Sequence, residues 1–271
     1  MSTSVSTMNL GLTRAKYEFI AYFREFDALF FTFLFPIIML GIFSAAFSGM
    51  GDIGAHGASV NFATYYLPAM AAAGILLSGV QNLAVRIAEE KGDGTLKRLG
   101  GTPLAPLSYF AGKLLTSVST GAIQLALLLL FSHFAFGVQL PTDPAKYLQL
   151  TWIFLLGILT CGLLGIALSA VPRSGRSATA VVIPLVLFLQ FISGVYLPFS
   201  QLPSWMQTVA SLFPLKWLAQ GMRSVFLPDD LKTLEVGGEW NLGLIALVLL
   251  GWLVVGLVVS RLTFRWIRKD A

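Results

Sequence analysis

Long apolar intervals alternate with short charged ones along this chain. Six intervals contain no Asp, Glu, Lys or Arg, and each is long enough for a helix of about 20 residues, the length that crosses a hydrocarbon core about 30 Å thick. The pattern therefore predicts six transmembrane helices. We place them at Ala28–Ser48, Phe62–Arg86, Tyr109–Phe136, Leu148–Val171, Ser177–Leu197 and Asn241–Phe264.

The composition supports this interpretation. Of the 271 residues, 56% are hydrophobic and 11% are charged, and the mean hydropathy is +0.79. Soluble domains carry about 25% charged residues, and a water-soluble core could not bury so much apolar surface. The predicted fold class is an all-α integral membrane protein, with residues 1–271 forming a single transmembrane domain.

The basic residues favour one orientation. Most of the 18 Lys and Arg residues fall before the first span, between spans two and three, between spans four and five, or after the last span. Because basic residues collect on the cytosolic side, both termini are expected there. The net charge of +5 then indicates topology and contact with anionic lipid, rather than nucleic-acid binding. The inner set is Arg14, Lys16, Arg24, Arg86, Lys91, Lys97, Arg98, Lys113, Arg173, Arg176, Arg261, Arg265, Arg268 and Lys269.

An amphipathic helix is predicted over residues 9–27, before the first span. Apolar residues recur there every three or four positions, and Arg14, Glu18 and Glu25 lie on the other side. This pattern is typical of a helix in the membrane interface. The alternative is that the first span begins early and frays. The apolar positions are Leu12, Ala15, Phe19, Phe23, Phe26 and Phe30.

A helical hairpin is predicted on the outer side, over residues 198–232. Pro203 begins one short helical pattern that carries Trp205, and Pro214 begins a second. Proline breaks, aromatic residues and few charges favour a hairpin that dips into the outer leaflet, that is, a re-entrant hairpin. The alternative is an ordinary external loop.

The inner loop over residues 87–108 is the most polar part of the chain. Gly94 frees the backbone to turn, and Thr95 is a candidate cap for a short helix. In that helix Leu96 and Leu99 share one side, while Lys97 and Arg98 project into the cytosol. A short rigid helix held below the membrane is suited to docking a soluble partner.

Two motifs make a family resemblance specific. The chain resembles the type-2 ABC exporter permeases across most of its length, and the daunorubicin-resistance-type permeases are the nearest subgroup. The inner-loop motif is Glu89-Glu90-Lys91, Gly94-Thr95-Leu96-Lys97-Arg98-Leu99 and Thr102-Pro103-Leu104. The second motif is Ser193-Gly194, Pro198, Leu202-Pro203, Trp205, Pro214-Leu215 and Arg223.

The resemblance implies a mechanism and its partners. Gly94–Leu99 would be a coupling helix in a groove of an ATP-binding subunit, and Glu89 and Glu90 would mark the helix end that presses on that subunit. Two permease chains, identical or related, and two ATP-binding subunits would form the exporter in a prokaryotic cell membrane. Lys97 stands where we expect an acid in the family pattern. The outer gate would be formed by the hairpin residues Pro198, Pro203, Trp205 and Pro214.

No catalytic or cofactor motif is found in the sequence. A phosphate-binding loop needs Gly-x-x-x-x-Gly-Lys-Ser/Thr, but before Gly112-Lys113 the first glycine position is Leu107, and Leu114 replaces the hydroxyl residue. ATP and magnesium are therefore expected on the partner, with no cofactor in this chain. Cys161 is interpreted as a packing residue. A membrane enzyme or assembly factor without ATP coupling is the rival class.

Polar residues inside the predicted spans are amides and a serine. Such amides commonly form hydrogen bonds between helices, and the alternative is that they contact a transported substrate. Apolar walls with a few amides favour a hydrophobic or amphipathic cargo, such as a drug or a lipid-like molecule. A polysaccharide or glycolipid exporter remains the alternative. The residues are Gln81, Asn82, Gln124, Gln190 and Ser193.

Overall fold

A computed structural model describes residues 7–47, 49, 51–55, 58–102, 104–172 and 174–263. Pro103, Arg173 and the basic residues after Thr263 lie outside the described residues. The prediction of an all-α membrane protein is confirmed, because the described part is mostly helical and has six helices long and apolar enough to cross a membrane. They are Phe30–Phe47, Phe62–Gly92, Pro106–Phe136, Pro144–Leu168, Gly175–Ile192 and Leu242–Thr263.

Two of these spans contain π-helical turns. The first span joins η1 (Phe30–Leu34) to α3 (Phe35–Phe47), and the second joins α4 (Phe62–Leu76), η3 (Leu77–Gln81) and α5 (Asn82–Gly92). The other spans are α7 (Pro106–Phe136), α8 (Pro144–Leu168), α9 (Gly175–Ile192) and α12 (Leu242–Thr263). Between or before them lie α1 (Thr7–Tyr22), α2 (Phe26–Leu29), α6 (Thr95–Gly100), η4 (Phe199–Gln201), α10 (Ser204–Ser211), α11 (Pro214–Phe226) and η5 (Asp229–Leu234).

Local sequence signals account for several helix boundaries. α7, α8 and α11 each have proline in the first turn, where its missing N–H has no helical partner to lose. Gly137 ends α7 in the left-handed conformation, with φ of 65°. Ser174 and Ser177 form a reciprocal capping box at the start of α9.

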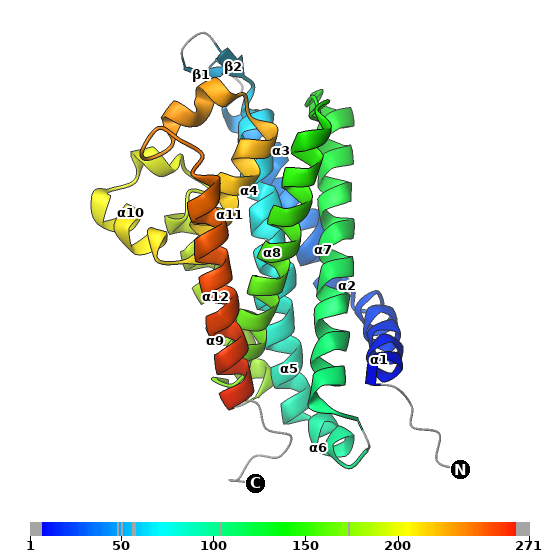
Figure 1. Ribbon diagram of the computed structural model, residues 1–271. Helices are drawn as coiled ribbons and strands as arrows, with labels where there is room; N and C mark the ends of the chain where they lie inside the picture. Colours follow the sequence, from blue (N-terminus) through cyan, green and yellow to red (C-terminus); the bar gives the residue numbers. More distant parts are fainter. Residues whose placement is uncertain are drawn as a thin grey trace.

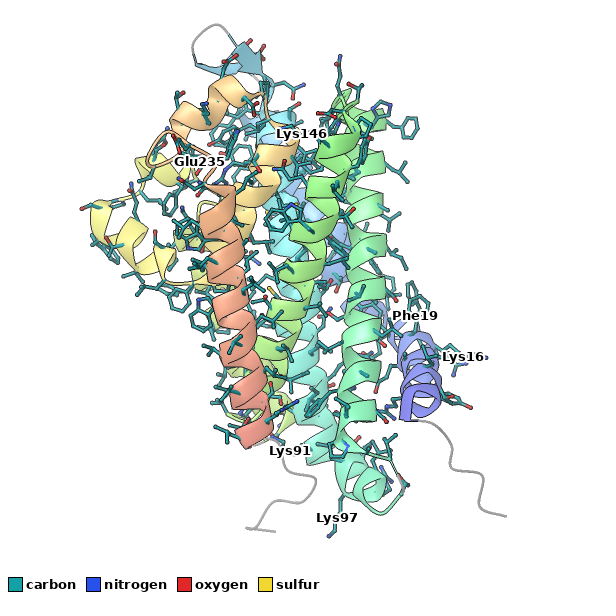
Figure 2. All side chains as sticks on the ribbon, in the orientation of Figure 1. Lys16, Phe19, Lys91, Lys97, Lys146 and Glu235 are labelled. Atoms are coloured by element: carbon teal, nitrogen blue, oxygen red, sulfur yellow. The ribbon has the colours of Figure 1, made fainter. Side chains whose placement is uncertain are left out.

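The helices stand side by side with distinct ends (Figure 1). One end carries α6 and the last residues of α12, and we call it the α6 end. The opposite end carries an antiparallel strand pair, β1 (Ile53–Ala55) and β2 (Ala58–Val60), which the sequence pattern did not predict. Lys97 projects from the α6 end, whereas Lys146 and Glu235 lie at the other (Figure 2).

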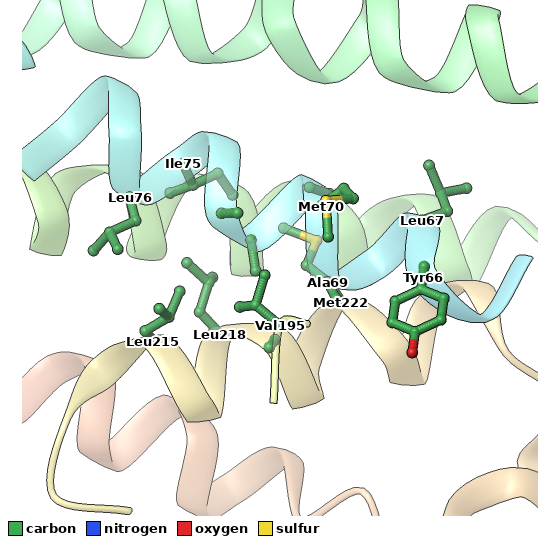
Figure 3. Packing of buried hydrophobic residues seen from close by; sticks show 14 of the residues in the cluster. Tyr66, Leu67, Ala69, Met70, Ile75, Leu76, Val195, Leu215, Leu218 and Met222 are labelled. Carbon is green, nitrogen blue, oxygen red and sulfur yellow. The ribbon is translucent and has the colours of Figure 1, made fainter. Parts of the chain in front are cut away.

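The core forms where α4 packs against α11 (Figure 3). All thirteen residues of α11 are buried, and its Leu215, Leu218 and Met222 contact the α4 layer around Met70. The segment 198–232, which we call the outer segment after its predicted side, therefore contributes a helix to the interior of the fold, because α11 is enclosed by α4, α8 and α12.

Small residues bring η3 against α8. A Cβ atom added at Gly79 would lie 2.5 Å from the Cβ atom of Cys161 and 2.9 Å from the backbone of Gly162. Contacts this short do not occur between real side chains, so only glycine fits at position 79. Cys161 is fully buried and is a packing residue at this contact, as interpreted from the sequence.

α1 lies along α7 near the α6 end (Figure 1). Its buried side includes Ala15, Glu18 and Tyr22, whereas Leu12 and Tyr17 are 54% and 66% exposed. An apolar exposed side fits the predicted interfacial location, which stays a prediction. The side of α1 that carries Glu18 packs against α7 of the same chain, whereas Lys16 is exposed.

Candidate functional site

The α6 end positions the predicted coupling residues on a tight turn. Gly94 takes φ of 79°, a left-handed conformation that favours glycine, and α6 begins directly after it. The prediction that Thr95 caps this helix is wrong. Thr95 is the first helical residue, and its backbone N–H donates to Asp93 Oδ1 over 2.8 Å. This hydrogen bond also holds the pKa of the exposed Asp93 carboxyl below its usual value.

α6 has one buried and one exposed side. Leu96 is 1% exposed and packs in a small cluster with Ile87 of α5 and Tyr109 of α7. Leu99 is half-buried against the same cluster. Lys97 and Arg98 are exposed, and Figure 2 shows Lys97 pointing away from the bundle. Leu96 therefore anchors α6 to the ends of α5 and α7.

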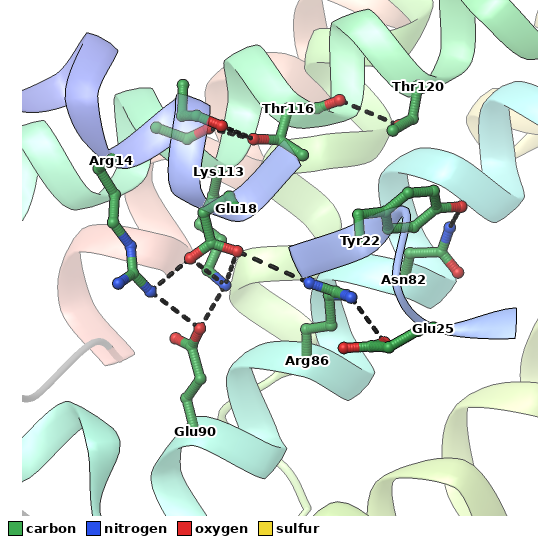
Figure 4. Close-up of polar contacts among 12 residues, drawn as sticks. Arg14, Glu18, Tyr22, Glu25, Asn82, Arg86, Glu90, Lys113, Thr116 and Thr120 are labelled. Carbon is green, nitrogen blue, oxygen red and sulfur yellow. Dashed lines mark hydrogen bonds and ion pairs between the residues drawn. The ribbon is translucent and has the colours of Figure 1, made fainter. Parts of the chain in front are cut away.

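A charged cluster lies beside this anchor (Figure 4). Lys113 Nζ lies 2.8 Å from a Glu18 carboxylate oxygen and 2.7 Å from Glu90 Oε1. Arg14 pairs with both Glu18 and Glu90, and the contact with Glu90 is 3.0 Å. The Tyr109 hydroxyl donates to Glu90 over 2.6 Å. The charged cluster therefore joins α1, the end of α5 and the start of α7.

A second arm extends the charged cluster along α5. Arg86 lies 2.6 Å from Glu25 Oε2 and 3.8 Å from Glu18. Burial by itself raises the pKa of Glu18, but the charges of Lys113, Arg14 and Arg86 outweigh it and hold this pKa below 4.5. The complete charged cluster consists of Arg14, Glu18, Glu25, Arg86, Glu90 and Lys113.

The two predicted acids differ in their surroundings. Glu90 belongs to the charged cluster, so its carboxylate is held by residues of its own chain. The Glu89 side chain points elsewhere, with its Cγ close against Gly175 at the start of α9. It makes no hydrogen bond or ion pair with another described residue. Their predicted contact with an ATP-binding subunit stays a prediction.

The predicted pathway amides are dispersed. Asn82 Nδ2 donates to Thr32 Oγ1 over 2.9 Å and to the Tyr22 hydroxyl over 3.2 Å, so it joins α5 to η1 and α1. Its neighbour Gln81 has no hydrogen bond to a described residue. Gln81, Asn82 and Glu89 line one cavity of about 460 Å³, which we call the α5 cavity.

The remaining polar residues lie deeper in the bundle. Gln124 is buried on α7 against Gly74, and neither of its amide atoms has a partner among the described residues. Gln190 accepts a short hydrogen bond from the Tyr196 hydroxyl, whereas the Ser193 hydroxyl has no described partner. The structure thus does not bring these three residues together with Gln81 and Asn82.

The predicted outer-gate residues flank the short helices of the outer segment. Pro198 precedes η4, Pro203 precedes α10, and Pro214 is the first residue of α11. Trp205 on α10 is 60% exposed. Two α-helices, α10 and α11, thus occupy this segment, and their roles as a re-entrant hairpin and a gate stay predictions.

Lys113 is the main functional candidate that sequence reasoning missed. The sequence pattern counts it only among the basic residues of the inner side, but α7 begins at Pro106 and leaves Lys113 about two turns inside the helix, 1% exposed. A lysine so far inside an apolar helix indicates a paired or functional group. Across the described part of the chain, including the charged cluster, no group of three or more His, Cys, Asp or Glu residues is arranged to hold a metal ion.

Comparison with known proteins identifies the class. The family model described as ABC-2 family transporter protein matches residues 51–260, and the chain therefore belongs to this family of membrane transporters. The linearmycin resistance permease protein LnrN of Bacillus subtilis (strain 168) is 30% identical over 139 residues, covering 51% of this chain and 35% of the relative. ABC transporter G family member 23 of Dictyostelium discoideum is 24% identical over 172 residues, covering 63% of this chain and 24% of the relative. The matches thus span about a third and a quarter of these relatives' lengths.

Proposed function

We propose that this chain is the membrane permease of an ATP-driven exporter that moves hydrophobic or amphipathic compounds out of a prokaryotic cell. The observation that carries the proposal is α6, a short helix anchored by Leu96 to the ends of two spans with Lys97 and Arg98 exposed. Family membership supports it, as does the similarity to a protein named as a linearmycin resistance permease. A place in the daunorubicin-resistance-type subgroup is part of the proposal.

In this proposal the α6 end faces the cytosol and docks on an ATP-binding subunit, which holds ATP and magnesium. A pair of permease chains and two ATP-binding subunits form the transporter. Movement of the subunit displaces α6, and the Leu96 contact passes the displacement to α5 and α7. The charged cluster keeps α1 attached to the same two helices, so all three elements move together.

The test reverses the exposed charges of α6 without disturbing its buried side. In the double variant Lys97→Glu, Arg98→Glu the helix should stay anchored by Leu96, while its charge toward the partner is inverted. We expect normal permease levels in the membrane but loss of ATP-driven efflux and of transport-linked ATP hydrolysis, measured in vesicles that also contain the transporter's ATP-binding subunit.

A matched control is the double variant Lys16→Glu, Lys232→Glu, which makes the same change in net charge at two exposed lysines away from α6. This control should retain efflux. Normal efflux from the α6 variant, at equal permease levels, would show that α6 is a solvated turn and would contradict the proposed coupling.

A further inference from the structure

The α5 cavity has three walls. One is formed by α2 and η1, the second by η3 and α5, and the third by α9. Its volume of about 460 Å³ is in the range of sites for drug-sized ligands, about 300–1,000 Å³. Phe26 and Phe31 form part of its wall and are 74% and 52% exposed, so its rim is apolar and faces the surroundings of the bundle. The opposite part of the wall carries charged and amide groups. The cavity is therefore amphipathic.

Both π-helical segments of the described chain contribute to this cavity. Phe31 comes from η1 and Gln81 from η3. A π-helical turn is rare, because it widens the helix and weakens its hydrogen-bond geometry, and it is found frequently at functional sites. Two such turns from different spans meeting at one cavity indicate that the distortions shape a binding site.

The charges that line the cavity do not balance. Arg86 is paired with Glu25 at 2.6 Å, so these two groups compensate each other. Glu89 has no ionic partner among the described residues, and Gln81 has no hydrogen bond there. Next to its apolar walls the cavity thus presents the Glu89 carboxylate and the Gln81 amide, neither of which has an ion pair or hydrogen bond within the described part of the chain. A partly desolvated carboxylate is stabilised by a cation at close range.

We propose that the α5 cavity is the inner-leaflet entry site for the cargo and that it binds cationic amphiphiles. The cationic group lies against Glu89 with the Gln81 amide beside it, and the apolar body lies against Phe31 and Ile183. This inference rests on the proposed export function and names its substrate class. It also gives Glu89 a role toward the cargo, separate from the α6 surface that docks the ATP-binding subunit.

The test uses two probes of the same size and shape but opposite charge, the tetraphenylphosphonium cation and the tetraphenylborate anion. Purified permease is placed in nanodiscs of phosphatidylcholine, and binding is measured by equilibrium dialysis against empty nanodiscs. We expect saturable binding of the cation and no saturable binding of the anion. Glu89→Gln keeps the shape of the side chain and should weaken binding of the cation by about tenfold, equivalent to 1.4 kcal/mol.

Three further variants make the test specific. Asp230→Asn removes one acid at the opposite end of the protein and should leave binding unchanged. Glu89→Asp keeps the charge and should retain most of the binding. Ile183→Trp fills the cavity and should weaken binding of the cation without removing a charge. All variants are compared only if their thermal unfolding matches that of the wild-type protein.

A second arm distinguishes a soluble cation from a cationic lipid. A single-chain trimethylammonium lipid is added to the nanodiscs, and its competition with the phosphonium probe is measured. If the lipid displaces the phosphonium probe, the result supports the site and indicates that its cargo is a lipid. If the probe stays bound in the presence of the lipid, the result supports the site and indicates that its cargo is a soluble compound. Equal binding by wild type and Glu89→Gln, or equal binding of the two probes, would overturn the inference.

The binding measurement needs neither ATP nor an ATP-binding subunit. A failure of the cavity inference therefore differs from a failure of the proposed export function. If α6 charge reversal abolishes efflux while Glu89→Gln leaves binding unchanged, the export function stands and the cavity assignment is wrong. If Glu89 governs binding but no ATP-driven efflux is found, the cavity stands as a binding site for cationic amphiphiles, whereas the export function and the cavity's role in cargo entry are both wrong.

Discussion

Lys113→Met tests whether the charged cluster holds α1, α5 and α7 together. The Lys113 side chain is 1% exposed, and its ammonium group lies within 2.8 Å of both Glu18 and Glu90. Methionine has a similar length and suits an apolar surrounding, so the substitution removes the charge with little change in packing. It leaves two carboxylates, at 5% and 17% exposure, with Arg14 as their shared partner.

The expected loss of folding stability follows from this geometry. Removing one partner of a buried ion pair costs about 3–5 kcal/mol, because the other charge remains buried without compensation. Glu18 and Glu90 both keep Arg14, so we expect the lower end, about 3 kcal/mol. On the scale of soluble domains of 150–250 residues, this corresponds to a fall in the melting temperature of roughly 6–12 °C.

The assay is thermal unfolding of the purified protein in detergent at pH 7, followed by tryptophan fluorescence. Lys16→Met is the matched control, because Lys16 lies on α1 but projects away from the bundle (Figure 2). Adding Glu18→Gln to Lys113→Met should recover part of the loss, since it removes the uncompensated charge. If Lys113→Met lowered the melting temperature no more than Lys16→Met does, the charged cluster would not hold the three helices together. Strict additivity of the effects of Lys113→Met and Glu18→Gln would contradict it as well.

Three further predictions concern separate contacts. Leu96→Ala should cost about 2–5 kcal/mol locally and increase hydrogen exchange over residues 93–102, whereas unchanged protection there would mean that α6 is held by other contacts. Gly79→Ala should destabilise the fold by about 1–3 kcal/mol, because its Cβ atom would overlap Cys161, and Gly251→Ala, with no neighbour within 4 Å, should not. Because the pKa of Glu18 is lowered in the fold, its contribution is present above its ordinary value of 4.5 and lost as pH falls through the folded value. The difference in melting temperature between wild type and Glu18→Gln should therefore stay constant from pH 8 to about 5 and shrink below 4.5; a loss already at pH 6 would contradict this.

Several elements depend only on local rules and could be predicted from the sequence. A charge-free run of about 20 residues is a span because unpaired backbone groups are too costly in lipid, and the six spans follow from this. Proline at 203 and 214 breaks the outer segment, since it cannot continue a preceding helix. Gly94 and the alternation of Leu96 with Lys97 define α6 in the same local way.

Which polar residues meet depends on packing between helices that are far apart in sequence. Lys113 and Glu18 are 95 residues apart in sequence, and Arg14 and Glu90 are 76 apart, so no local pattern pairs them. Gln81 and Asn82 are adjacent and both carry an amide side chain. Asn82 donates hydrogen bonds to η1 and α1, whereas Gln81 lines the α5 cavity without a hydrogen bond to a described residue.

The π-helical turns belong to the same group of tertiary effects. Neither η1 nor η3 has a sequence signature in this chain, and their residues have the pattern of an ordinary transmembrane helix. η3 packs closely on α8, and this contact requires glycine at position 79. The contact fixes the position of η3 in the bundle. The direction of a polar side chain inside a span is set by such contacts between helices, which hydropathy along one chain does not encode.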